Sequence, residues 1–196
     1  MDHILKKYCP RIDFDSYEDF RDNFKIEVPE AFNFGFDVVD EWAAVEPEKR
    51  ALVWCNDHDE ERIFTFTDIS RLSNQAANAL VARGIEKGDV VMAILRRRWE
   101  YWVLAAALCK IGAIIIPATL QLTKKDIAYR VNSANVKMLV CVHDEYVCTQ
   151  VEQALPECPS VEAKIVVAGE RTAGFPSAEC SKASPKPSNA PRGMRV

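Results

Sequence analysis

No set of residues in this sequence has the types and spacing of a catalytic centre. His3, His58 and His143 lie in an N-terminal segment, a charged turn and the end of a predicted strand, and none has a nucleophile and an orienting acid near it in the sequence. The patterns G-x-S-x-G, G-x-x-x-x-G-K and G-x-G-x-x-G are missing from the sequence, which argues against serine hydrolases, P-loop proteins and dinucleotide-binding proteins. The sequence therefore predicts no catalytic residue.

One compact basic cluster could bind phosphate. Arg96, Arg97 and Arg98 directly follow a run of apolar residues that predicts a buried strand. Guanidinium groups bind phosphate through paired N–H donors, so this run is a candidate phosphate contact. The alternative interpretation is a solvated run of charges in front of a helix.

Four residues could in principle bind zinc. Cys141, His143, Cys148 and Cys158 are close in sequence, and zinc takes thiolate and imidazole ligands. There is no C-x-x-C pair, and Cys141 lies inside an apolar run that predicts a strand. We therefore expect no metal site and interpret the cysteines most simply as buried thiols in a reducing compartment.

Gln121 is the third polar candidate. It lies in the run Pro117–Leu122, just beyond a predicted buried strand, Ala113–Pro117. In open parallel sheets, ligands collect at the carboxyl ends of the strands, and an amide side chain offers both a donor and an acceptor. The alternative is a loop glutamine that bonds only to the neighbouring backbone.

Strands and helices alternate around these candidates. Thr65 to Asp68 has the pattern of a capping box, and the apolar spacing that follows predicts a long helix closed at Gly84. The strands predicted after it are Val90–Leu95, Ala113–Pro117, Lys137–Val142 and Lys164–Ala168, and the helices between them are Trp99–Ile111, a helix capped by Thr123 that runs through Val131, and Asp144–Leu155. This order predicts an α/β fold, a partial doubly wound and mostly parallel sheet flanked by helices.

Composition places the chain among ordinary globular proteins. It has 196 residues, of which 48% are hydrophobic and 28% charged. The formal net charge of -4 gives no electrostatic case for a nucleic-acid partner. The N-terminus lacks a secretory or mitochondrial targeting pattern, so we expect a cytoplasmic protein. The window 103–122 is interrupted by polar residues and by Gly112 and Pro117, so we expect no membrane span.

The composition changes along the chain and predicts three parts. Residues 1–30 are rich in acidic and aromatic side chains and are expected to form an N-terminal arm. Residues 31–171 carry the alternating strands and helices of the predicted domain. Residues 172–196 contain four prolines and few large apolar side chains, so we expect a disordered tail.

Residues 30 to 170 resemble a known family at many positions. The strongest pieces are Thr65–Asp68 (TFTD), Ser73–Asn78 (SNQAAN), Gly84–Val90 (GIEKGDV) and Gly112–Pro117 (GAIIIP). They resemble the N-terminal part of the AMP-forming acyl-CoA synthetases, within the adenylate-forming ligases, and are most similar to the medium-chain branch. Members of the family carry a Ser/Thr/Gly-rich phosphate loop, and we expect this chain to stop before it.

The resemblance implies a two-step reaction for the complete enzyme. ATP and a fatty acid give an acyl-adenylate and diphosphate, and coenzyme A then displaces AMP to form the thioester. ATP, coenzyme A and Mg²⁺ are the implied cofactors, and the glutamine that matches Gln121 contacts coenzyme A. The matching loop at Arg96 to Arg98 is usually shorter and less basic. Without the phosphate loop and the family's C-terminal lysine, we expect the chain to be inactive alone and to bind none of these ligands tightly.

Two other interpretations remain open at this point. The chain could be a non-catalytic binding module whose protein partner is a separately encoded remainder or a full-length homologue, because an incomplete sheet leaves apolar faces and an unpaired edge. It could also be a free-standing small α/β protein that shares only its scaffold with the family.

Overall fold

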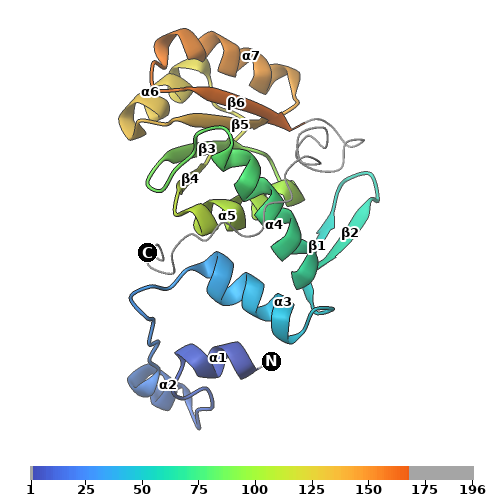
Figure 1. Cartoon of the computed structure of the whole chain (residues 1–196), viewed down its shortest axis with the longest axis vertical. Coiled ribbons are helices and arrows are strands. Elements are labelled where there is room, and N and C mark those ends of the chain that lie inside the picture. Colours follow the sequence, from blue (N-terminus) through green and yellow to red (C-terminus); the bar gives the residue numbers. More distant parts are fainter. Residues whose placement is uncertain (1, 168–196) are drawn as a thin grey trace.

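A four-stranded parallel sheet forms the centre of the protein. The computed structural model describes residues 2–167. The strands are β3 (Val90–Ile94), β4 (Ile114–Pro117), β5 (Met138–Val142) and β6 (Ala163–Val167). Their order is β4-β3-β5-β6 and all neighbours are parallel (Figure 1). Since the chain moves from β3 to β4 and then crosses to β5 and β6 on the other side, the sheet is doubly wound. The predicted fold class is confirmed.

Helices cover both faces of this sheet. One face is covered by α4 (Phe66–Val81) and α5 (Trp99–Ile111), and the other by α6 (Lys124–Ala134) and α7 (Glu145–Ala154). Val91 of β3 is buried with α4 and α5, whereas Met92 is buried with α6 and α7. Successive strand residues point to opposite faces, which explains why β3 and β5 are apolar throughout.

The ends of α4 confirm the local signals in the sequence. The Asp68 amide donates to Thr65 Oγ1 at 3.1 Å, and the Thr65 amide donates to Asp68 Oδ2 at 3.1 Å. The Thr65 amide, together with the Thr65 hydroxyl, which donates to the same Asp68 oxygen at 2.9 Å, holds the pKa of Asp68 below its usual value. At the other end, Gly84 has φ +84° and its amide donates to the Val81 carbonyl at 2.9 Å. A left-handed residue after a helix favours glycine, as predicted.

The strand predicted over residues 113–117 is not buried. β4 lies at the edge of the sheet, none of its four residues is buried, and Ile114 is 52% exposed. An apolar run predicts a strand, but it does not reveal whether a second neighbour covers the strand's free side. Pro117, which has no N–H to donate, suits such an edge.

A hairpin packs beside α4 and α5. Strands β1 (Arg50–Cys55) and β2 (Glu61–Thr65) are antiparallel, and Phe66, the residue after β2, begins α4. The Phe64 and Trp99 rings lie 5.1 Å apart. The hairpin is thereby anchored to the start of α5.

The N-terminal segment begins with α1 (Asp2–Tyr8) and α2 (Tyr17–Asn23) and continues through a π-helical turn (Gly35–Asp40) into α3 (Glu41–Val45). The Tyr8 ring meets Phe32 edge-on at 5.3 Å, so α1 packs onto the residues before α3. The boundaries predicted at residues 30 and 171 stay predictions, and the predicted tail lies outside the described residues.

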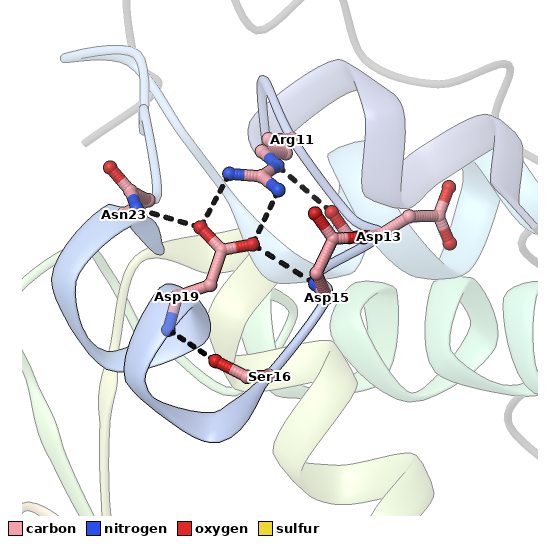
Figure 2. Close-up of polar contacts among 6 residues, drawn as sticks. All are labelled: Arg11, Asp13, Asp15, Ser16, Asp19 and Asn23. Carbon is pink, nitrogen blue, oxygen red and sulfur yellow. Dashed lines mark hydrogen bonds and ion pairs between the residues drawn. The ribbon is translucent and has the colours of Figure 1, made fainter.

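No residue of α2 is buried. The helix is held by contacts of the Phe20 ring with the rings of Phe14 and Phe24, whose centroids lie 5.3 and 4.8 Å away, and by polar contacts. Figure 2 shows the Arg11 guanidinium reaching both carboxylate oxygens of Asp19, at 2.7 and 2.5 Å, while Ser16 Oγ accepts from the Asp19 amide. Within residues 2–167, no helix is both long and apolar enough to cross a membrane.

Candidate functional site

Three loops leave neighbouring strands at one edge of the parallel sheet. Residues 95–98 follow β3, residues 118–123 follow β4, and residues 143–144 follow β5; we call these three loops the carboxyl edge. The Ala118 amide donates to the Ala93 carbonyl at 2.9 Å, which keeps the first two loops side by side where they begin. The change of winding direction lies between β3 and β5, where ligands bind in open α/β sheets.

The loop after β3 holds two exposed guanidinium groups on a fixed backbone. Arg96 has φ +54°, a left-handed conformation that is costly for a residue with a side chain. The carbonyl of Arg97 accepts a hydrogen bond from Trp54 Nε1 at 2.7 Å, so the hairpin β1–β2 supports the loop. The side chains of Arg96 and Arg97 are exposed, and they remain the candidates for phosphate contact.

Arg98 has a different role from its two neighbours. Its Nη2 lies 2.6 Å from Glu100 Oε1 and its Nε lies 3.1 Å from Glu100 Oε2. The side chains of Arg98 and Glu100 are 16% and 1% exposed, so this ion pair is buried at the start of α5. A buried carboxylate requires such a partner, which makes Arg98 structural and corrects the hypothesis of a three-arginine phosphate site.

Gln121 lies in the turn between β4 and α6. Its backbone amide donates to Thr119 Oγ1 at 3.4 Å, and its side chain is exposed. Within residues 2–167 the side-chain amide of Gln121 makes no hydrogen bond to the protein. The structure therefore does not show the alternative arrangement, in which this side chain bonds to the neighbouring backbone. Leu122 is buried directly after it, and Thr123 caps α6 with Asp126. Gln121 therefore stands free on a well-fixed loop.

The loop after β5 contributes no metal centre. His143 is exposed at the end of β5, and Asp144 caps α7 by accepting from the Val147 amide at 3.0 Å. In the described part of the chain, no group of three or more His, Cys, Asp or Glu side chains could hold a metal ion. These residues therefore offer no ligand set for the family's Mg²⁺. Cys55 is exposed, so the expectation that the cysteines are buried is wrong at this position.

A buried lysine that the sequence reasoning missed joins the N-terminal segment to the domain. Lys110 Nζ lies 2.6 Å from Asp40 Oδ1 and 2.8 Å from Asn74 Oδ1, and its side chain is 3% exposed. The hydroxyl of Ser70 donates to the same Asp40 oxygen at 2.7 Å. Burial holds the pKa of Lys110 below its usual value, although Asp40 offsets part of that effect. A lysine in the last turn of a helix that is otherwise apolar from Trp102 onward was the signal in the sequence.

The π-helical turn fits closely against this lysine. Asn33 Nδ2 donates to the Cys109 carbonyl at 2.6 Å, and a Cβ at Gly35 would lie only 2.5 Å from Cγ of Lys110. Residues 33–40 and α5 are therefore packed closely against each other. This contact holds the N-terminal segment on the outer side of α4 and α5 (Figure 1).

A family model described as AMP-binding enzyme matches residues 39–194 of this chain. The chain belongs to the AMP-binding enzyme family. The resemblance inferred from its residues is thereby confirmed, and the matched region contains the whole sheet and the carboxyl edge.

Relatives in this family are much longer than the chain. It is 34% identical over 168 residues to acyl-coenzyme A synthetase ACSM3, mitochondrial, of Mus musculus, an alignment that covers 83% of this chain and 29% of the relative. It is 36% identical over 154 residues to ACSM4, mitochondrial, of Rattus norvegicus, covering 76% and 26%. The chain thus spans less than a third of the length of these relatives.

Solved structures show the same fold. A fatty acyl CoA synthetase of Mycobacterium tuberculosis has a TM-score of 0.62 at 22% identity, over 69% of this chain and 26% of that one. The anthranilate CoA ligase AuaEII, solved with anthranoyl-AMP, has a TM-score of 0.63 at 23% identity, over 71% and 26%. The described residues therefore have the architecture found in part of these larger ligases.

Proposed function

We propose that this chain forms the N-terminal part of an enzyme that joins a medium-chain fatty acid to coenzyme A by the AMP-forming route. Membership of the AMP-binding enzyme family and the names of the two relatives support this proposal. The observation that carries it is the carboxyl edge, where Arg96 and Arg97 are exposed beside the change of winding direction and Gln121 is exposed on the neighbouring loop after β4.

The proposed reaction forms two bonds in sequence. A carboxylate oxygen attacks the α-phosphorus of ATP and diphosphate leaves; the thiolate of coenzyme A then attacks the acyl carbon and AMP leaves. In this scheme Gln121 bonds to the amide or adenine groups of coenzyme A, which offer both donors and acceptors. Arg96 and Arg97 contact phosphate oxygens. The described residues bind and orient, and the reacting groups come from elsewhere in the complete enzyme.

The 196-residue chain alone is proposed to be inactive. The sequence of residues 2–167 carries neither a Ser/Thr/Gly-rich phosphate loop nor an acid, base and nucleophile with the spacing of a catalytic centre. The test is to incubate the purified chain with octanoate, ATP, Mg²⁺ and coenzyme A and to measure octanoyl-CoA by mass spectrometry. No product above the protein-free blank is expected. Product formation that stops when ATP is omitted would overturn the proposal.

A second candidate function is that of a non-catalytic subunit. The observation that favours it is the edge strand β4, whose Ile114 is half exposed and has no strand on its outer side in residues 2–167. The partner would be a separately encoded remainder or a full-length homologue. Co-purification of tagged chain with full-length ACSM3, lost on Ile114→Lys but not on the matched Tyr129→Lys, would favour it, and separate elution would refute it.

Cytoplasmic residence is a further part of the proposal. It rests on the N-terminal composition, whereas both relatives are described as mitochondrial. Imaging of the chain fused at its C-terminus to a fluorescent protein distinguishes the two locations. Co-localisation with a mitochondrial dye would refute the cytoplasmic assignment.

A further inference from the structure

Three aromatic side chains lie exposed along α2. Tyr17, Phe20 and Phe24 follow one another at helical spacing, so they share one side of the helix and of the residue that ends it. They are 71%, 42% and 39% exposed. The Phe20 and Phe24 rings stack with their centroids 4.8 Å apart. We call these three residues the aromatic stripe, and Figure 1 shows α2 at the end of the molecule away from the sheet.

The stripe belongs to the part of the protein that exposes the most apolar surface. Sixteen large apolar residues of the described chain are exposed, and eight of them lie between Leu5 and Phe36. Exposed apolar side chains that are scattered singly are ordinary, but neighbouring ones mark a surface for interaction. The stripe is therefore a candidate binding surface.

The surroundings of the stripe are acidic. Residues 11–30 hold seven acidic and three basic side chains, a net charge of -4. Two of the basic groups are already paired with carboxylates, Arg11 with Asp19 (Figure 2) and Arg21 with Asp22. Like charges repel, so the same segment of a second copy is a poor partner. The surface favours a partner that is positively charged and packs well on aromatic rings.

The chain itself contains a segment with this chemistry. Residues 181–196 hold four basic side chains, three prolines and no acidic side chain. Proline-rich segments bind aromatic surfaces because the extended helix that proline favours loses little entropy on binding. Lysine and arginine add attraction to carboxylates and to the faces of the rings. Residues 168–180, which join this segment to β6, span about 45 Å when extended, close to the diameter of a compact domain of this size.

We propose that residues 181–196 bind the aromatic stripe of the same chain. The prolines pack against the rings, and the basic side chains pair with the acidic side chains of residues 11–30. Because the two segments belong to one chain, a contact that is weak between separate molecules is favoured by the high effective concentration. The contact covers the exposed rings and so keeps them from associating with other proteins. This inference does not rest on the proposed function, since the carboxyl edge takes no part in it.

Carbodiimide cross-linking of the purified full chain tests the proposal, because it joins lysine amines to carboxylates that touch them. The ion pair of Lys137 with Asp89, at 2.8 Å, is the internal reference. We expect cross-links from Lys182 and Lys186 to acidic residues within 11–30 in the monomer. Absence of these cross-links while the reference forms would overturn the proposal. So would cross-links to the acidic turn at residues 57–61 instead, or cross-links found only in dimers, which would indicate the segment of a second copy.

A matched pair of variants tests the part played by the rings. Tyr17→Ala should lower the yield of these cross-links several-fold relative to the reference. Tyr129→Ala, at a tyrosine of α6 that is 70% exposed, should leave the yield unchanged. Equal yields in Tyr17→Ala and the unaltered chain would contradict the role of the stripe. Circular dichroism of each variant confirms that it is folded.

Competition by a synthetic peptide of residues 181–196 tests the part played by the segment. An excess of the peptide should lower the cross-link within the chain several-fold. The same peptide with its three prolines replaced by alanine should compete less well, because it has more conformational freedom to lose. A cross-link that persists unchanged in excess peptide would refute the proposed contact.

Discussion

Replacing Asp40 by Asn tests whether the buried lysine holds the N-terminal segment on the domain. The substitution keeps the size of the side chain and an acceptor oxygen, but it leaves the ammonium group of Lys110 without its carboxylate. Lys110 is 3% exposed and Asp40 is 30% exposed, so water replaces the lost charge only in part. Asn74 still accepts from Lys110 at 2.8 Å.

The expected loss at pH 7 is about 2 kcal/mol of unfolding free energy. Removing one partner of a fully buried ion pair costs about 3–5 kcal/mol, and the partial exposure of Asp40 together with the remaining bond to Asn74 reduces this value. Lys110→Met, which removes the charge and keeps the apolar stem, should cost less, about 1 kcal/mol or under. A larger loss in Asp40→Asn than in Lys110→Met is the signature of an unpaired buried charge.

The loss should also depend on pH in one direction. Burial lowers the pKa of Lys110 in the folded protein, so between that pKa and the unfolded value of 10.5 the unfolded chain binds more protons. The unfolding free energy therefore rises with pH through this window. Without Asp40 the pKa of Lys110 in the folded protein falls further. The pH range over which the unfolding free energy rises therefore begins at a lower pH. The deficit of Asp40→Asn relative to wild type should shrink as the pH approaches 10.5.

Urea unfolding followed by tryptophan fluorescence at pH 7 and pH 9.5 measures both effects. The matched control is Asp22→Asn, which breaks the exposed pair with Arg21, where both side chains are more than half exposed. That control should cost no more than about 0.5 kcal/mol. An Asp40→Asn loss equal to the control, or a deficit that grows with pH, would refute the role given to Lys110.

Three further predictions concern local features of the fold. Thr65→Ala removes the hydroxyl that caps α4 and should cost about 1 kcal/mol in the same unfolding assay, and a neutral result would contradict the capping role. Gly112→Ala places a side chain at φ +79°, 3.1 Å from Cγ of Lys87, and should cost about 1 kcal/mol or more; retained stability would show that the turn relaxes. Glu100→Gln removes the charge opposite Arg98 and should lower the melting temperature, whereas the control Glu145→Gln, at an exposed residue, should not. Equal melting temperatures of the two variants would refute the stabilising role of the buried Arg98–Glu100 ion pair.

Local sequence signals predicted the elements of the fold well. The helix Trp99–Ile111 has the bounds that the structure gives it, because Gly112 adopts the left-handed conformation that ends it. The helix after Thr123 runs to Ala134, three residues beyond the predicted end at Val131. It ends there because Asn135 adopts the left-handed conformation, whereas the prediction relied on the spacing of apolar residues. The burial of β4 was predicted wrongly because composition alone does not reveal whether a strand lies at an edge.

The candidate site was predictable only in part. The position of Gln121 beyond a strand follows from the chain order, and the structure places it on the carboxyl edge. The pairing of Arg98 with Glu100 and of Lys110 with Asp40 depends on which side chains the packed helices enclose, and charge patterns alone do not show that. Contacts between residues distant in sequence were therefore the part that needed the structure.

Exchanging segments between this chain and a relative tests the account most directly. The aligned segment of mouse ACSM3 is replaced by the matching residues of this chain, and acyl-CoA formation by the chimera is measured with octanoate. We predict an active chimera in which Gln121→Ala raises KM for coenzyme A several-fold and leaves KM for ATP unchanged. A folded chimera without activity, or a Gln121→Ala variant with unchanged kinetics, would contradict the placement of this chain and the role of its carboxyl edge.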